Sequence, residues 1–486
     1  AAPRAPRAVA TMAVRSRALR PPEPPPERAP AARSPARGPV VDVDGAVVDV
    51  LGAVVVTASA AVVVVTATVV LVVSAVVVIF GTAPAATVGG FQVTLTDVLT
   101  AFVGAAFAAR LLRRAQVPRP AWGLVVILLL VLWSLFRGIG DHGVATAANE
   151  ARGTLNVYFV ALYFATMKPS EQLRERIGRA WLLYAVFLVV LAVERWLAVF
   201  GPLPTSDAWY IPGEYGGLRV LWSDEAFALG QALVILLPGL MRGGLTRVQR
   251  VMAMVVLATV LLTQHRSVWA ATLVGIALVL LLEGNIGRKW ARRLILATGI
   301  VAVALMTFFS GPLLEQTVSS SDAARSETFE WRMEGWTALY RDSGPESLAE
   351  VAVGRPYGAG WLRRLTSLGY STDVVPHNYY VEQSLRVGVI GVIALLVVYG
   401  GVMRRLSWLS QQRPQDGLLS DRMLLILLAM QLLYYIPYWP SSEQALLLGI
   451  AVAATRASGG PPDAGAAATA TGGAAGSAGT LAPVQR

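Results

Sequence analysis

Apolar residues along this chain are gathered in long blocks that are separated by short polar or charged connections. Many blocks are roughly 17 to 25 residues long, which is the length of a helix that crosses the hydrocarbon core of a bilayer. From Val50 to Thr96 the sequence contains no charged side chain. This pattern predicts an all-α integral membrane protein, a polytopic bundle of about twelve transmembrane helices.

The apolar blocks and the residues that break them place twelve spans. They lie near 52–80, 93–112, 121–137, 153–167, 180–200, 225–241, 249–264, 268–283, 294–310, 380–400, 422–437 and 442–456. The first nine fall within residues 49–310 and the last three within 380–456. A long connection over 311–379 therefore separates the ninth span from the tenth.

The two ends of the sequence differ from the rest in composition. Residues 1–48 are rich in Pro, Ala and Arg, and residues 457–486 are rich in Gly, Ala and Pro. Both compositions are typical of disordered tails. Much of the net charge of +11 lies in residues 1–40, which hold eight Arg and two Glu. We interpret this basic tail as an anchor that fixes orientation or contacts anionic lipid, and no nucleic acid partner is expected.

The distribution of Lys and Arg orients the bundle, because cytoplasmic loops carry an excess of these residues. One set of alternate short loops holds 19 basic residues; it comprises 110–119, 168–179, 242–250, 284–293 and 404–422. The other set holds 4; it comprises 81–92, 137–152, 201–224, 264–267 and 438–443. The first set is therefore predicted to be cytoplasmic. Both termini then lie in the cytoplasm, as an even number of spans requires.

The connection over 311–379 falls on the extracytoplasmic side. Its six Arg do not contradict this placement, because the charge rule applies to short loops. Within 324–340, apolar residues recur at helical spacing, namely Phe329, Met333, Trp336 and Tyr340. This spacing predicts an amphipathic helix that lies either on the membrane surface or against the outer end of the bundle.

Composition limits the chemistry that the chain can perform. It contains no Cys, which excludes disulfides and thiol nucleophiles, and only three His, at His142, His265 and His377. No carboxylates have the spacing of a metal site, so neither a metal nor a cofactor is predicted. The glycine-rich segment 354–360 lacks the preceding strand and the following Lys-Ser/Thr of a phosphate-binding loop, which favours a plain turn.

Two arginines are predicted to lie at the extracytoplasmic face. Arg266 lies in the very short turn 263–267 between two apolar spans, where charge is costly and often functional. The alternative is an interfacial Arg that reaches the lipid headgroups. Arg219 precedes Ser223 and Asp224, either of which would cap the sixth span. A loop Arg paired with Asp224 is the alternative to a site residue here.

His377 lies at the start of the predicted tenth span. Histidine is the side chain best suited to move a proton near neutral pH, although a hydrated interfacial His is the alternative. Asn378 is predicted to cap the helix that follows. Glu382 and Arg386 are four residues apart and are predicted to pair with each other.

Two fixed guanidinium groups and a histidine suit glycosyl transfer from a lipid diphosphate. Arg binds phosphate bidentately and can neutralise the charge that develops on a diphosphate leaving group. Histidine can take the proton from an attacking hydroxyl. This combination predicts transfer outside the membrane.

The sequence also resembles the O-antigen ligase and polymerase family of bacterial membrane glycosyltransferases over roughly residues 90–456. Three stretches carry the resemblance: Arg219 with 223–238; 261–269; and 332–336 followed by 354–360, 376–380 and 387–391. In two places the chain departs from the family. Residues 223–226 replace an Asn-Pro-Asn-like segment, and His265 stands where a small or polar residue is common.

The resemblance implies a C-type glycosyltransferase-like fold in the bacterial cytoplasmic (inner) membrane. It implies an undecaprenyl-diphosphate-linked glycan as donor, a glycan or other hydroxyl acceptor, and no required metal. By matching motif, Arg219 and Arg266 would bind the donor diphosphate, and His377 would be the general base. The expected function is that of a surface polysaccharide polymerase or ligase.

Two other classes of protein are compatible with many membrane spans. A transporter or lipid-linked glycan flippase often has two similar halves joined by a long cytoplasmic loop. Here the long connection is predicted to be extracytoplasmic and no repeat of six spans is visible, which favours the enzyme. The third possibility is a non-catalytic partner in glycan assembly.

Overall fold

The computed structural model describes residues 86–88, 91–113, 117–168, 170–200, 219–291, 293, 332–365, 370–413 and 415–456. These residues are mostly helical. The helices and strands are β1 (Ala86–Val88), β2 (Phe91–Val93), α2 (Leu95–Leu112), η1 (Arg119–Ala121), α3 (Trp122–His142), α4 (Val144–Ala165), α5 (Glu171–Phe200), α6 (Ser223–Arg242), α7 (Arg247–Leu262), α8 (Arg266–Leu282), α11 (Leu348–Val353), β3 (Leu362–Leu365), β4 (Tyr370–Asp373), α12 (Tyr379–Arg386), α13 (Gly388–Gln412), α14 (Asp421–Tyr434) and α15 (Ser442–Ala454).

Four of the described helices are long and apolar enough to cross a membrane. They are Arg119–His142, Glu171–Ala198, Ser223–Arg242 and Gly388–Gln412; Arg266–Leu282 and Ser442–Ala454 are apolar but shorter. The described chain is thus consistent with an all-α membrane protein. The count of twelve spans stays a prediction. The predicted first and ninth spans and both predicted tails lie outside the described residues.

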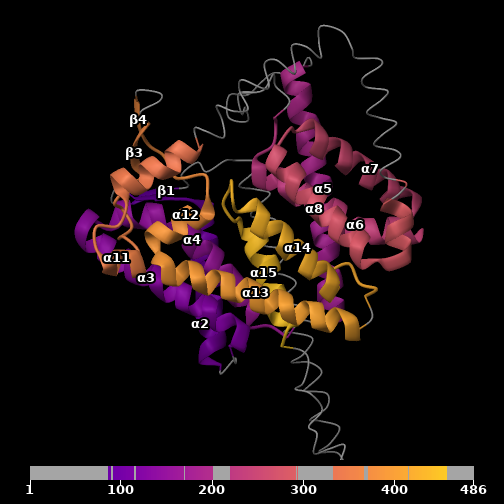
Figure 1. The fold of residues 1–486 in the computed structure, drawn as a ribbon, viewed down its shortest axis with the longest axis horizontal. Coiled ribbons are helices and arrows are strands. Elements are labelled where there is room, and N and C mark those ends of the chain that lie inside the picture. The colour runs from indigo at the N-terminus through magenta and orange to yellow at the C-terminus, as the bar shows by residue number, and fades with distance from the viewer. Residues whose placement is uncertain are drawn as a thin grey trace, which may run out of the picture. The chain divides into compact units, whose positions relative to one another are not determined.

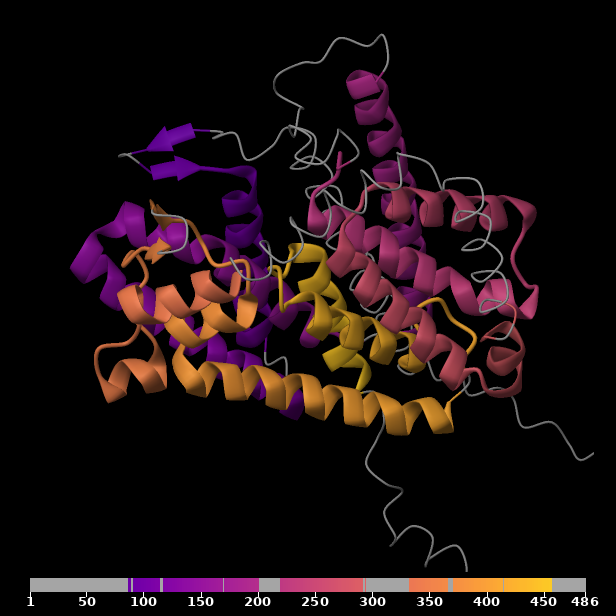
Figure 2. The same cartoon turned by 45° about the horizontal axis from the view of Figure 1, so that its top comes forward.

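Helices α14 and α15 lie between two groups of helices (Figure 1). On one side α15 packs against α4, which also contacts α2 and α3. On the other side α14 packs against α8. Helix α8 packs in turn against α6, which also contacts α7. Figure 2 shows α13 as one long orange helix, and it contacts both α3 and α14.

Small residues allow close packing at the middle of the second group. A Cβ atom on Gly230 of α6 would lie 2.2 Å from Oγ1 of Thr272 in α8. A Cβ atom on Gly275 of α8 would lie 2.5 Å from Sδ of Met430 in α14. Small residues at helix contacts are common in membranes, because lipid supplies no hydrophobic force that drives helices together.

The predicted tenth span is wrong in its boundaries. Residues 380–400 were expected to form one helix, but the chain breaks between α12 and α13 at Val387 and Gly388. Gly388 has φ of +69°, and a Cβ atom there would lie 2.2 Å from the carbonyl oxygen of Ala352. Gly354, with φ of +82°, approaches the backbone of Arg386 equally closely. The break therefore forms where the connection over 311–379 docks, and the apolar helix is α13. We call this segment the outer connection, because it is predicted to be extracytoplasmic.

The predicted pair between Glu382 and Arg386 is also wrong. Arg386 is buried and forms an ion pair with Glu150 of α4, and it donates to the carbonyl oxygen of Gly360 at 2.6 Å. Its guanidinium lies 3.9 Å from the ring centroid of Trp361. Glu382 instead accepts a hydrogen bond from Thr154 of α4. Arg386, which belongs to α12, thus connects the predicted glycine-rich turn to α4.

The outer connection contains more structure than the predicted helix. Residues 332–343 are helical, and a hairpin follows in which Leu362 of β3 pairs with Asp373 of β4. Leu339 packs with Trp361 and Leu385 in a small core, whereas Met333 and Tyr340 are exposed. The described residues therefore leave much of the predicted apolar face uncovered, and its contact with the membrane surface stays a prediction. The face of this helix that carries Leu339 packs against the described residues. Phe329 lies outside the described residues.

Replacing Arg386 with Ala should lower the free energy of unfolding by about 3 to 5 kcal/mol, because the Glu150 carboxylate would stay largely buried without its cation. Thermal unfolding in detergent measures this loss. Arg341→Ala is the control, because it removes an exposed ion pair with Asp342 in the same outer connection. Equal losses in the two variants would contradict the role given to Arg386.

Candidate functional site

A cavity of about 340 Å³ lies at the N-terminal end of α6. Three chain segments line it: the start of α6, the segment before α12, and the connection between α14 and α15. The lining residues are Ser223, Asp224, Val375, Pro376, His377, Tyr434, Tyr438, Trp439, Pro440 and Ser441. The side chain of His377 is exposed to this space. The cavity combines an imidazole, a carboxylate, hydroxyl groups and aromatic rings.

Backbone contacts hold His377 in place on the α14–α15 connection. The indole Nε1 of Trp439 donates to the carbonyl oxygen of Pro376 at 3.3 Å. The amide of Tyr379 donates to the carbonyl oxygen of Tyr435 at 3.0 Å. Asn378 caps α12, as predicted, by accepting a hydrogen bond from the amide of Val381. His377 is thus held by its neighbours on both sides.

A buried ion pair fixes the start of α6. Glu225 accepts a hydrogen bond from the amide of Trp222 at 2.9 Å and lies 3.5 Å from Nη1 of Arg195 in α5. The same Arg195 nitrogen donates to the carbonyl oxygen of Val220 at 2.7 Å. Trp222 is therefore the N-cap residue, and the prediction that Ser223 or Asp224 caps the helix is wrong. This leaves Asp224 at the cavity, and Ser223 accepts a hydrogen bond from the Tyr434 hydroxyl.

The turn that contains His265 contacts the segment just before α6. His265 is buried, and its Nε2 lies 2.8 Å from the carbonyl oxygen of Leu221, to which it donates. Burial lowers the pKa of His265 to about 4, and the positive charge of Arg219 acts in the same direction. His265 is therefore a neutral structural residue. Gln264 has φ of +53°, so this turn is tight.

Residues 219–224 are the common element of the site. At one end Arg219 lies near His265, the N-cap of α8, and Arg266 follows as the exposed first residue of that helix. At the other end Ser223 and Asp224 line the His377 cavity. Segment 219–224 therefore connects the His265 turn with the His377 cavity, but neither Arg219 nor Arg266 is among the residues that line this cavity. Their catalytic roles remain predictions.

Sequence reasoning missed two contributions to this cavity. The guanidinium carbon of Arg332 lies 5.9 Å from the ring centroid of Tyr438, so an arginine of the outer connection packs on a residue that lines the cavity. The aromatic residues Tyr434, Tyr438 and Trp439 form the second contribution. Their dense spacing between two apolar spans was a visible signal. Arg332 lay within a family-like stretch, but nothing in its spacing pointed to a cavity.

Among the described residues, no three His, Asp or Glu side chains gather as a metal-ligand group. The fold and the composition of its helices are those expected of an α-helical membrane protein. No protein-family model and no curated protein matches the chain. The resemblance to O-antigen ligases and polymerases therefore remains an expectation that rests on the motifs themselves.

The contribution of His265 to the stability of the protein should fall as the pH is lowered from about 6.5 to 5. The folded state holds the pKa of His265 near 4, well below its ordinary value of 6.5, so the unfolded chain binds more protons in this window. The contribution of His265 is fully present above pH 6.5, and a loss on the order of 2 kcal/mol is expected by pH 5.

Thermal unfolding in detergent at several pH values measures this effect. A His265→Gln variant, which keeps a donor for the carbonyl oxygen of Leu221 but does not titrate, should lose less stability than the wild type, or gain more, between pH 6.5 and pH 5. An unchanged slope in that variant would show that other groups cause the pH dependence.

Proposed function

We propose that this protein is a glycosyltransferase of the bacterial cytoplasmic membrane, with both termini in the cytoplasm. It would transfer a glycan from an undecaprenyl-diphosphate-linked donor to a glycan or other hydroxyl acceptor on the extracytoplasmic face. Its biological role would be that of a surface polysaccharide polymerase or ligase. The cavity that contains His377, at one end of segment 219–224, is the observation that carries this proposal.

The composition of the cavity suits a sugar acceptor. Aromatic rings such as those of Tyr438 and Trp439 offer flat apolar surfaces with a polar edge. The carboxylate of Asp224 and the hydroxyl of Ser441 can form hydrogen bonds with sugar hydroxyl groups. An acceptor held there would present a hydroxyl to the exposed imidazole of His377.

The proposed reaction is a single displacement at the anomeric carbon of the donor. The acceptor hydroxyl oxygen forms a bond to that carbon while His377 takes the hydroxyl proton. The bond between the anomeric carbon and the diphosphate oxygen breaks, and the lipid diphosphate leaves with the electron pair. Arg219 and Arg266 stabilise the charge that develops on this leaving group.

The placement of the two arginines supports this division of roles. Arg266 is exposed at the start of α8, and Arg219 lies near the neutral His265 that precedes it. Burial keeps His265 uncharged at neutral pH, so the fixed positive charges there belong to the arginines. Arg332 of the outer connection would add a further cation close to Tyr438.

The packing of α6 favours an enzyme over a transporter or flippase. A transport path would have to run from the His377 cavity towards the far end of α6. The contacts of Gly230 with Thr272 and of Gly275 with Met430 bring α6, α8 and α14 together at mid-length. The described structure therefore has a site at one end of the helices and close packing in the middle.

A purified-enzyme assay with a prenyl-diphosphate-linked glycan and a glycan acceptor tests the proposal. His377→Ala should lower the rate by about 10² to 10⁴-fold, the usual contribution of a general base. Arg266→Ala should lower it by about 10²-fold or more, because charge on the leaving group loses a partner. Arg266→Lys should recover part of that loss, since it keeps the charge but not the bidentate geometry.

Two matched variants control for nonspecific effects. His142→Ala removes an exposed histidine at the end of α3, and Arg119→Ala removes an exposed arginine of η1. Both should retain the wild-type rate. Full activity in both His377→Ala and Arg266→Ala would rule out the mechanism.

A further inference from the structure

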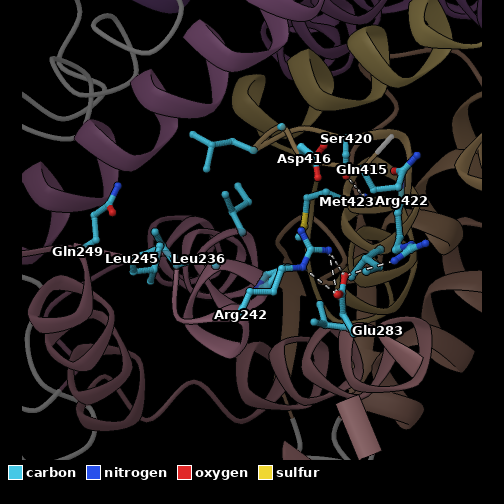
Figure 3. Close-up of a pocket in the computed structure, with 18 residues that line it drawn as sticks. Leu236, Arg242, Leu245, Gln249, Glu283, Gln415, Asp416, Ser420, Arg422 and Met423 are labelled. Carbon is cyan, nitrogen blue, oxygen red and sulfur yellow. Dashed lines mark hydrogen bonds and ion pairs between the residues drawn. The ribbon is translucent and has the colours of Figure 1, made fainter. Parts of the chain in front are cut away.

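A second cavity, of about 310 Å³, lies at the C-terminal end of α6 (Figure 3). It is lined by the end of α6, the end of α8, the start of α7, and the loop that leads into α14. Helix α6 contains 20 residues, so its two ends are about 30 Å apart. This cavity and the His377 cavity therefore lie at opposite ends of one candidate membrane span.

The mouth of this cavity holds two arginines on one buried carboxylate. Glu283, whose side chain is 6% exposed, accepts hydrogen bonds from Nε and Nη2 of Arg242 at 2.9 to 3.2 Å. It also accepts one from Nη1 of Arg422 at 3.3 Å. Figure 3 shows Glu283 between the two guanidinium groups. The carboxylate thus positions both cations while neutralising only one of them.

Both guanidinium groups keep donors for a ligand. Within the described part of the chain, the bonds to Glu283 use two nitrogens of Arg242 and one of Arg422. The side chains remain 36% and 25% exposed, so the other nitrogens can be reached. Arg groups with free donors on one side are well suited to a tetrahedral oxyanion such as phosphate.

The cavity becomes apolar with depth along all three helices. Ile235 and Leu236 lie about two turns inside Arg242, Val279 lies one turn before Glu283, and Ile426 lies one turn after Arg422. A soluble phosphate compound would use only the mouth. A cavity with cations outside and aliphatic side chains inside is complementary to an amphiphile.

We propose that this cavity binds a phospholipid, with the phosphate on Arg242 and Arg422 and the start of an acyl chain against the apolar wall. Asp416, an exposed carboxylate on the rim, brings the formal charge of the four groups to zero. That balance favours a zwitterionic headgroup, whose ammonium would face Asp416. The inference is independent of glycosyl transfer, since it concerns the other end of α6.

Native mass spectrometry of the full chain in detergent, titrated with phosphatidylethanolamine, tests this site. The wild-type protein should retain one phospholipid that the Arg242→Ala/Arg422→Ala double variant binds about tenfold more weakly or worse. The double variant Arg247→Ala/Arg250→Ala removes two exposed arginines at the start of the adjacent α7, outside the cavity. It should bind like the wild type. Equal retention in all three proteins would overturn the proposal.

A second variant separates a lipid from a free phosphate and guards against misfolding of the arginine variant. Leu245→Trp fills the cavity from its half-buried wall and leaves both arginines and Glu283 in place. It should lose phosphatidylethanolamine while keeping the thermal stability of the wild type. Unchanged lipid binding in this variant, or displacement of the lipid from the wild type by millimolar inorganic phosphate, would contradict a phospholipid site.

Discussion

The ion pair between Arg195 and Glu225 is the interaction on which the candidate site depends. Both side chains are almost fully buried, so each would be costly without the other. Together they bind the backbone on both sides of Leu221, through the amide of Trp222 and the carbonyl oxygen of Val220. Fixing this short segment positions Asp224 at the His377 cavity and offers the carbonyl oxygen of Leu221 to His265.

A second buried cation organises the outer connection. Arg386 ties the turn at Gly360 to Glu150 of α4 and covers the ring of Trp361. The positive φ of Gly354 and Gly388 allows the two backbones to meet at the break between α12 and α13. Because His377 lies two residues before the start of α12, this arrangement also helps to hold His377 at its cavity. Two long-range ion pairs thus position chain segments that carry no regular structure of their own.

The helices could be predicted from sequence because their signal is local. Blocks of apolar residues marked α3, α6, α8 and α15 to within a few residues. The break at Gly388 could not be found in this way, because Val387 and Val389 continue the apolar pattern. The partner of Arg386 was mistaken for Glu382, four residues away, because Glu150 is 236 residues away in sequence. The cap of α6 was misplaced because Glu225 reaches back to Trp222 and leaves Ser223 inside the helix.

The candidate site could be predicted only in part, for the same reason. His377, Arg219 and Arg266 were chosen for chemistry and predicted topology, and of these three only His377 lines the cavity. Tyr438 and Arg332 meet only through tertiary folding. The proposed topology places the His377 cavity on the outside and the Arg242–Arg422 cavity on the cytoplasmic side. The chain has no cysteine, so Ser441→Cys and Asp416→Cys can each be labelled with a membrane-impermeant thiol reagent. We expect Ser441→Cys to react in intact cells and Asp416→Cys to react only after permeabilisation, whereas the reverse pattern would contradict the proposed topology.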